Sequence, residues 1–138
     1  NHVRLTMKFT LSEPVWAAVS FLESEECLMT PRGGGAGEVV YAQPQSSGGG
    51  FDVSLGSLLP SLKAFSPANN QAFLDGLTPL AEVDGFGGSV AEFSNGELIM
   101  GFARAYAAKP SILQLSFAYG SEAQIGYHPN RGCFLVNE

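Results

Sequence analysis

The chain opens with a strict alternation of apolar and polar side chains. Every second residue from Val3 to Leu11 is apolar, and the residues between them are basic or carry a hydroxyl group. This period of two is typical of a β-strand with one buried face. We therefore expect a half-buried strand over residues 3–11.

The period becomes helical after this strand. Ser12 can cap a helix that carries Pro14 in its first turn, and an apolar stripe follows on one face. The stripe comprises Val15, Ala18, Val19 and Leu22. Glutamates then crowd the end of the helix, where the helix dipole disfavours anions. We expect a helix from Ser12 to about Glu23 and a strand through residues 27–29.

The most strongly patterned segment runs from Phe51 to Phe65, and its period changes at Gly56. Apolar residues alternate with polar ones before this glycine, which predicts a strand. After it, Ser57 is suited to cap a helix, and the next apolar residues follow at the spacing i, i+4 and i+7. They are Leu58, Leu62 and Phe65. We expect the strand to end at Gly56 and a short helix to follow.

Glycine, proline and asparagine divide the remaining chain. Two glycine-rich stretches predict loops on either side of a short strand over residues 38–42. Ser66 and Pro67 predict the start of a second helix, which Asp75 and Gly76 would end.

The C-terminal half is dominated by predicted strands. The sequence Ser-Asn-Gly is a strong hairpin signal between strands over residues 90–93 and 97–106. Three further strands are expected over residues 112–119, 123–127 and 133–136. The sequence therefore predicts an α+β fold, a largely antiparallel sheet with two or three short helices on one face.

Composition narrows the class of protein. The 138 residues are 45% hydrophobic, which suits one globular domain over residues 1–138. No apolar run is long enough to span a membrane. The net charge of −6, from 7 basic and 13 acidic residues, disfavours binding to nucleic acid by bulk charge.

The two cysteines, Cys27 and Cys133, are too few for a disulfide-stapled scaffold or a four-ligand zinc site. We favour two reduced, buried thiols, and a disulfide formed in an oxidising compartment remains the alternative.

Catalytic chemistry is not evident in the sequence. His128 and Cys133 resemble a base and a thiol nucleophile, but no third orienting group accompanies them. The carboxylates of the second half are scattered, and we interpret them as solvated: Asp75, Glu82, Asp84, Glu92 and Glu97. We interpret the aromatic residues of the strands as core residues: Phe93, Phe102, Tyr106, Phe117, Tyr119 and Tyr127. We therefore expect no enzyme activity, no metal site and no cofactor.

Two segments carry a resemblance to a known family. The strand-to-helix pattern of Phe51–Phe65, with the sequence LQLSFAYGSEAQIGY from Leu113 to Tyr127, is similar to the N-terminal domain of sliding DNA clamps. The chain resembles most of all a subunit of the heterotrimeric DNA-damage checkpoint clamp. Arg131–Val136 would be the next strand of that domain, and residues 66–110 would be an insertion.

The resemblance implies a non-catalytic nuclear scaffold of the DNA damage response and DNA repair. Its partners would be homologous clamp subunits in a hetero-oligomeric ring, with duplex DNA passing weakly bound through that ring. Lys63 is the one basic residue of the short helix predicted after Gly56 and would face the DNA, while the helix from Ser12 to Glu23 has none.

Two alternatives of other classes remain. A secreted β-rich ligand-binding module would explain the glycine-rich loops, the few lysines and a possible link between Cys27 and Cys133. A hot-dog-type thioesterase would explain AEFSNGELIMGFARAY, Ala91–Tyr106, which resembles the closing hairpin of that fold.

Overall fold

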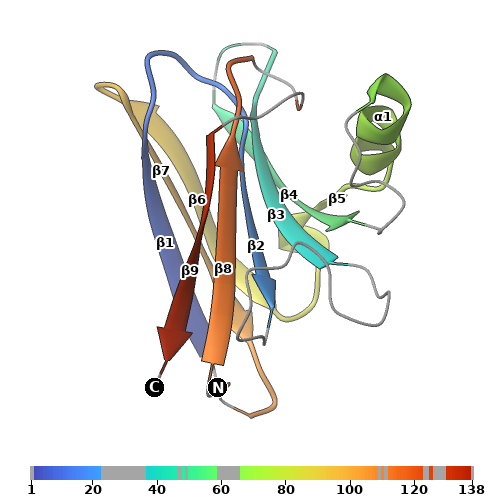
Figure 1. Cartoon of the computed structure of the whole chain (residues 1–138), viewed down its shortest axis with the longest axis vertical. Coiled ribbons are helices and arrows are strands. Elements are labelled where there is room, and N and C mark those ends of the chain that lie inside the picture. Colours follow the sequence, from blue (N-terminus) through green and yellow to red (C-terminus); the bar gives the residue numbers. More distant parts are fainter. Residues whose placement is uncertain are drawn as a thin grey trace.

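Two antiparallel β-sheets face each other across a shared core (Figure 1). The computed structural model describes residues 2–22, 37–46, 48, 50–58, 66–108, 110, 112–122, 125 and 130–137. Sheet A has the order β1-β7-β6, formed by His2–Thr10, Glu97–Ala105 and Phe86–Ser94. Sheet B has the order β5-β4-β3-β2-β8-β9, formed by Thr78–Pro79, Phe51–Leu58, Gly37–Pro44, Ala17–Leu22, Ile112–Tyr119 and Asn130–Asn137.

The main core lies between the two sheets. Both sheets supply large apolar side chains whose alternate positions point inward. From sheet A these include Phe9, Leu98, Met100 and Phe102, and from sheet B Val19, Phe21, Val40 and Leu115. The first strand is confirmed as β1, whose exposure alternates residue by residue, and it pairs with β7 from His2 to Thr10.

The expected helix from Ser12 to Glu23 is wrong, because this stretch contains the strand β2. All residues from Val15 to Phe21 are buried. Val19 and Phe21 face sheet A, whereas Trp16 and Ala18 belong to a second cluster on the other face of sheet B. A strand covered on both faces shows no alternation, so its apolar run imitates a helical stripe. The strand expected over residues 27–29 lies outside the described residues.

Gly56 does not end the strand, as we had expected from the change of period. Strand β4 continues through Gly56 and Ser57 to Leu58, so Ser57 is not a helix cap. A Cβ on Gly56 would lie 2.7 Å from the ring of Phe73, so the glycine makes room for this side chain. Residues 59–65, which would have formed the expected helix, lie outside the described part.

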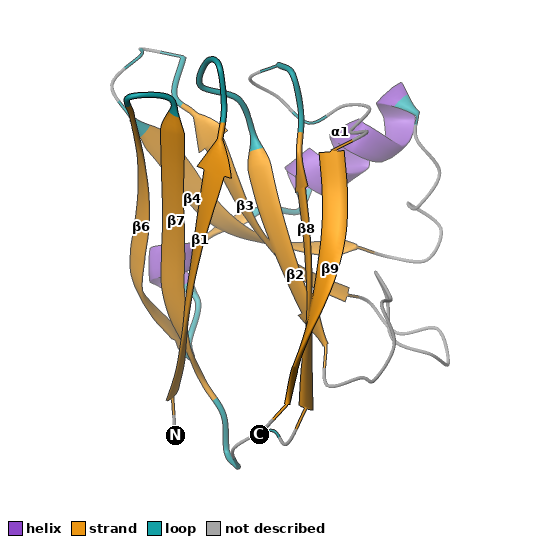
Figure 2. Ribbon diagram, turned by 60° about the vertical axis from the view of Figure 1, so that its left-hand side comes forward, coloured by secondary structure: helices purple, strands orange, loops and turns teal. Residues whose placement is uncertain are grey.

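The second predicted helix is confirmed as α1, Pro67–Asp75. Ser66 caps it, because the Asn69 N–H donates to Ser66 Oγ at 3.0 Å. Phe73 is its buried residue and packs with Tyr41 and Trp16 on the outer face of sheet B. Figure 2 shows α1 on the side of sheet B that faces away from sheet A.

The hairpin signal is also confirmed, since β6 and β7 flank Asn95 and Gly96. Both residues have positive φ, 52° and 76°, as the favoured two-residue hairpin turn requires. These two strands lie within residues 66–110 and form most of sheet A. A short 3₁₀ turn, η2, Leu80–Glu82, precedes them and buries Leu80 in the main core.

The largely antiparallel sheet is therefore confirmed, and the expectation of several helices on one face is not. Across the described ranges, every strand pair is antiparallel. The same ranges contain one α-helix, α1. The fold described here is a β-sandwich whose larger sheet is covered on both faces near its centre.

Because Gly56 lies close to the ring of Phe73, a larger side chain at position 56 should destabilise the fold. Replacing Gly56 with Ala should lower the free energy of unfolding by about 1–3 kcal/mol, because the Phe73 ring must move. Urea unfolding of Gly56→Ala and of the control Gly87→Ala measures this. Gly87 has open space where its Cβ would lie. Equal stability of the two variants would contradict this packing.

Candidate binding groove

An apolar groove runs between strand β1 of sheet A and strands β8 and β9 of sheet B. A cavity of about 350 Å³ forms one part of it, with a second cavity of about 470 Å³ beside it. The two share Thr6, Met7 and Phe134 and are therefore continuous along β1. The first is lined by Leu5, Thr6, Met7, Val19, Met100, Phe102, Leu115, Phe134 and Leu135.

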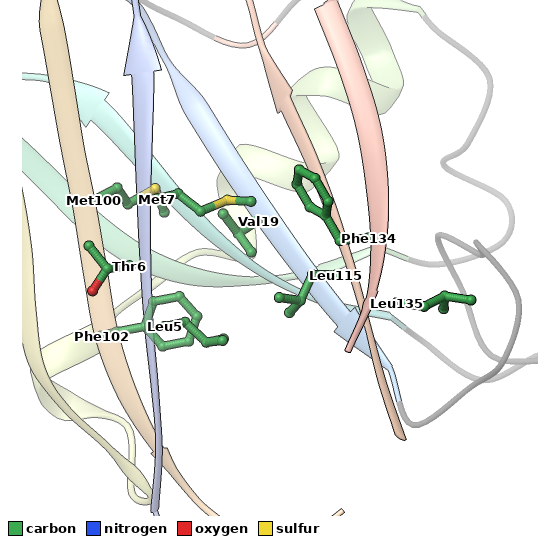
Figure 3. A pocket seen from close by; sticks show the side chains of 9 residues that line it. All are labelled: Leu5, Thr6, Met7, Val19, Met100, Phe102, Leu115, Phe134 and Leu135. Atoms are coloured by element: carbon green, nitrogen blue, oxygen red, sulfur yellow. The ribbon is translucent and has the colours of Figure 1, made fainter. Parts of the chain in front are cut away.

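Phe134 is the most informative residue of the groove. It lies opposite Leu115 in the ladder of β8 and β9, so its side chain is on the inner face of sheet B, toward the core. Its exposed fraction is nevertheless 52%. Figure 3 shows Met7 and Phe134 directed into the space between the strands, whereas Leu135 is directed away. The inner face of sheet B is therefore uncovered at β9.

Aromatic packing holds Phe134 in place. Its ring stacks on Phe117 with centroids 5.6 Å apart and an interplanar angle of 25°. Gly132, opposite Phe117, leaves room for this arrangement, since a Cβ there would lie 2.5 Å from the Phe117 ring. Phe117 in turn contacts Phe9 of β1 edge-on, at 6.1 Å. The groove wall is thus a continuous layer of rings anchored in the core.

The chemistry of the first cavity is apolar. Among the described residues that line it, Thr6 is the one with a polar side chain, and none has a charged side chain. Lys8 borders the second cavity and forms an ion pair with Glu97 of β7 at 3.7 Å. The apolar side chains that line the first cavity are suited to bind apolar groups of a ligand, and they supply no acid or base.

A separate cavity of about 370 Å³ lies on the outer face of sheet B. Ser20, Ser116, Arg131 and Cys133 contribute to its lining. Cys133 is in a disulfide, so the expectation of reduced thiols is wrong for this residue. The sequence has one other cysteine, Cys27, which lies outside the described residues.

The other site residues predicted from the sequence lie on different elements or fall outside the described residues. Lys63, proposed to face DNA, and His128 lie outside the described residues. Glu92 and Glu97 lie on β6 and β7, and Asp75 at the end of α1 accepts a hydrogen bond from Gln71. Glu82 and Asp84 lie in η2 and the turn after it. Among the described residues, no group of three or more His, Cys, Asp and Glu side chains is placed to hold a metal ion.

Four of the aromatic residues expected in the core lie there: Phe93, Phe102, Phe117 and Tyr119. Phe102 is buried, and Phe93, Phe117 and Tyr119 pack against the main core. Tyr106 lies beside Arg104, whose guanidinium carbon is 4.8 Å from its ring and 4.5 Å from that of Phe21. Arg104 also donates to Glu38 of sheet B at 2.7 Å, so it ties the two sheets together. Tyr127 lies outside the described residues.

Sequence reasoning missed the groove itself. Phe134 and Met7 each fit an ordinary half-buried strand, and nothing in their local pattern distinguishes a covered strand from an uncovered one. The missing signal is the width of each sheet, which depends on which strands pair.

Comparison with protein-family models, with curated proteins and with solved structures finds no match to this chain. None of the helices described here is both long and apolar enough to cross a membrane. The function must therefore be argued from the groove and its surroundings.

Tyr41 has a perturbed ionisation, and its role is structural. Burial raises the pKa of its hydroxyl well above the ordinary value, and a hydrogen bond from the Ile125 N–H at 3.0 Å opposes part of this rise. The hydroxyl donates to Gln43 Oε1 at 2.7 Å. Tyr41 therefore joins β3 to the segment at Ile125 beneath α1.

The raised pKa of Tyr41 predicts a loss of stability at high pH. The unfolded tyrosine ionises near pH 10, whereas the folded one stays neutral to higher pH. The unfolded state therefore releases its proton first, and the free energy of unfolding should fall as pH rises above about 10. Urea unfolding at several pH values should show a smaller fall for Tyr41→Phe. An identical pH dependence in wild type and Tyr41→Phe would contradict the burial of the hydroxyl.

Proposed function

We propose that this chain is a non-catalytic binding module, which holds apolar side chains of a partner in the groove between β1 and β9. The exposed inner face at Phe134 is the observation that carries the proposal. A large aromatic ring on the core side of a strand is normally covered, because burying it stabilises a fold by about 1.5–3 kcal/mol. A partner that covers Phe134 and Met7 gains part of that free energy.

The disulfide at Cys133 supports a secreted protein over a nuclear one. Disulfides form and persist in oxidising compartments and are rare in the cytosol and nucleus. The sequence contains one other cysteine, Cys27, and its link to Cys133 stays a prediction. A secreted protein corresponds to the β-rich module that the sequence offers as an alternative.

The sliding-clamp function remains a prediction of the sequence resemblance. It requires assembly with homologous subunits, and the sheet edges β1 and β9 are available surfaces for such assembly. We rank it below the binding module because one of its two expected helices, Ser12–Glu23, contains β2. The thioesterase alternative has no described carboxylate among the residues lining the groove to support it.

Mass measurement by light scattering tests the clamp prediction. If the resemblance is functional, the chain should form a larger complex when mixed with subunits of a checkpoint clamp. The binding-module proposal expects the mass of one 14.5 kDa chain in both cases. A stoichiometric complex would favour the clamp.

Titration with the fluorescent apolar probe anilinonaphthalene sulfonate tests the groove. We expect saturable binding to the native chain, which Phe134→Ala should weaken by about tenfold, equivalent to about 1.4 kcal/mol. The control is Ile99→Ala, because Ile99 is 41% exposed but lies opposite Lys8 on the outward face of sheet A. Absence of saturable binding, or equal loss in both variants, would overturn the proposal.

A further inference from the structure

We infer that the partner is an extended peptide segment that adds to sheet A as a fourth strand, beside β1 and opposite β9. This inference rests on the proposed binding function and names the class of partner. It depends on three features of the described residues: the relative width of the sheets, the backbone edge of β1, and the side chains on either side of that edge.

The widths of the two sheets leave one strand position vacant. Phe9 of β1 contacts Phe117 and Tyr119 of β8, with ring centroids 6.1 and 5.7 Å apart, so β1 lies over β8. Strand β9 is the next strand of sheet B, about 4.8 Å beyond β8. Sheet A ends at β1, so within the described residues no strand lies opposite β9. The place of one further strand of sheet A, beside β1, would therefore lie over β9, on whose inner face Phe134 lies.

The backbone of β1 is suited to receive that strand. All nine residues of β1 pair with β7 along one edge, and β1 is the terminal strand of its sheet in the described structure. In an antiparallel ladder, every second residue directs its N–H and C=O groups away from a given neighbour. These outward groups form a template for a further strand, and main-chain hydrogen bonds of this kind supply affinity in β-strand addition.

The side chains next to the edge define the sequence that would fit. Inward-pointing residues of the added strand would meet Leu5, Met7 and Phe134, which requires apolar side chains at every second position. On the outward face, Arg4 donates to the Gly88 carbonyl of β6 at 2.9 Å, and Lys8 pairs with Glu97 of β7 at 3.7 Å. Both side chains therefore extend over sheet A, away from the free edge, and the outward-pointing residues of the added strand would face solvent. The partner is thus a segment that alternates apolar with polar residues.

A second copy of this chain fits the position less well. Antiparallel pairing of two β1 strands in full overlap would place Thr6 opposite Thr6 and Arg4 of each copy opposite Lys8 of the other. Like charges directly opposite each other are destabilising. Sheet B also extends past β1 by one strand, β9, so the second copy's β9 would compete for the same space. A single peptide segment brings neither the like-charge pairs nor a second β9 strand into this space.

A nine-residue peptide that alternates valine with glutamate and threonine tests the inference on the full chain. Two matched controls are used: a peptide of the same composition with its valines grouped together, and the alternating peptide N-methylated along one edge. We expect the alternating peptide to bind at least about tenfold more tightly than either control by fluorescence anisotropy. The grouped peptide lacks apolar side chains at every second position, and the N-methylated peptide lacks main-chain donors, so only the alternating peptide has both.

Amide hydrogen exchange locates the binding. The alternating peptide should slow exchange at every second amide between Val3 and Phe9. Amides of β6, at the opposite edge of sheet A, should be unchanged and serve as the internal control. Phe134→Ala should lower the affinity for the alternating peptide by about tenfold, whereas Ile99→Ala should leave that affinity unchanged.

The remaining outcomes separate the two proposals. If the probe binds but the alternating and grouped peptides bind equally without protecting β1, strand addition is wrong and the binding groove stands. If neither probe nor peptide binds, both proposals fall. If exchange at β1 slows with rising protein concentration in the absence of peptide, the occupant is a second copy and the inference of a separate peptide partner is overturned.

Discussion

The unequal width of the two sheets is the constraint on which the rest of the structure depends. In the described part of the chain, sheet B has six strands and sheet A three, so sheet A can cover only part of the inner face of sheet B. Buried apolar area is the main source of stability, and large apolar side chains such as Phe21 and Phe102 lie where the sheets overlap. Beyond β1 the overlap ends, and Phe134 is left uncovered.

Among the described elements, the outer face of sheet B is covered by a helix and not by a second sheet. Here α1 covers the sheet, with Phe73 packed edge-on against Tyr41 at 5.5 Å between ring centroids. Trp16 extends this second cluster, and Gly120 makes room for it, since a Cβ there would lie 2.1 Å from the indole nitrogen. Strands β2 and β3 are consequently buried on both faces and act as the central layer of the molecule.

This layering explains which elements the sequence could predict. Strand β1 and the β6–β7 hairpin have one covered face or a specific turn, so their local patterns are sufficient. The helix α1 is marked by the Ser66 cap. The pattern of strand β2 resembles that of a helix because burial on both faces removes its alternation. Gly56 resembles a break in the local pattern because its role, to make room for Phe73, depends on a contact distant in sequence.

The groove could not be predicted for the same reason. Met7 and Phe134 are 127 positions apart in the sequence and meet only because β1 ends one sheet and β9 ends the other. No local pattern shows that, within the described residues, β9 has no strand opposite it. The chemistry of the groove follows from this geometry, because apolar side chains beside an open backbone edge favour an extended partner over a reactive one.

Hydroxyl-radical footprinting of the native chain tests the central claim most directly, because it reports the solvent access of individual side chains. If the inner face of β9 is uncovered, Phe134 should be oxidised far faster than Phe102, since their exposed fractions are 52% and 1%. Comparison with the urea-unfolded chain corrects for intrinsic reactivity. Protection of Phe134 equal to that of Phe102 would mean that the groove is closed, and would contradict the account.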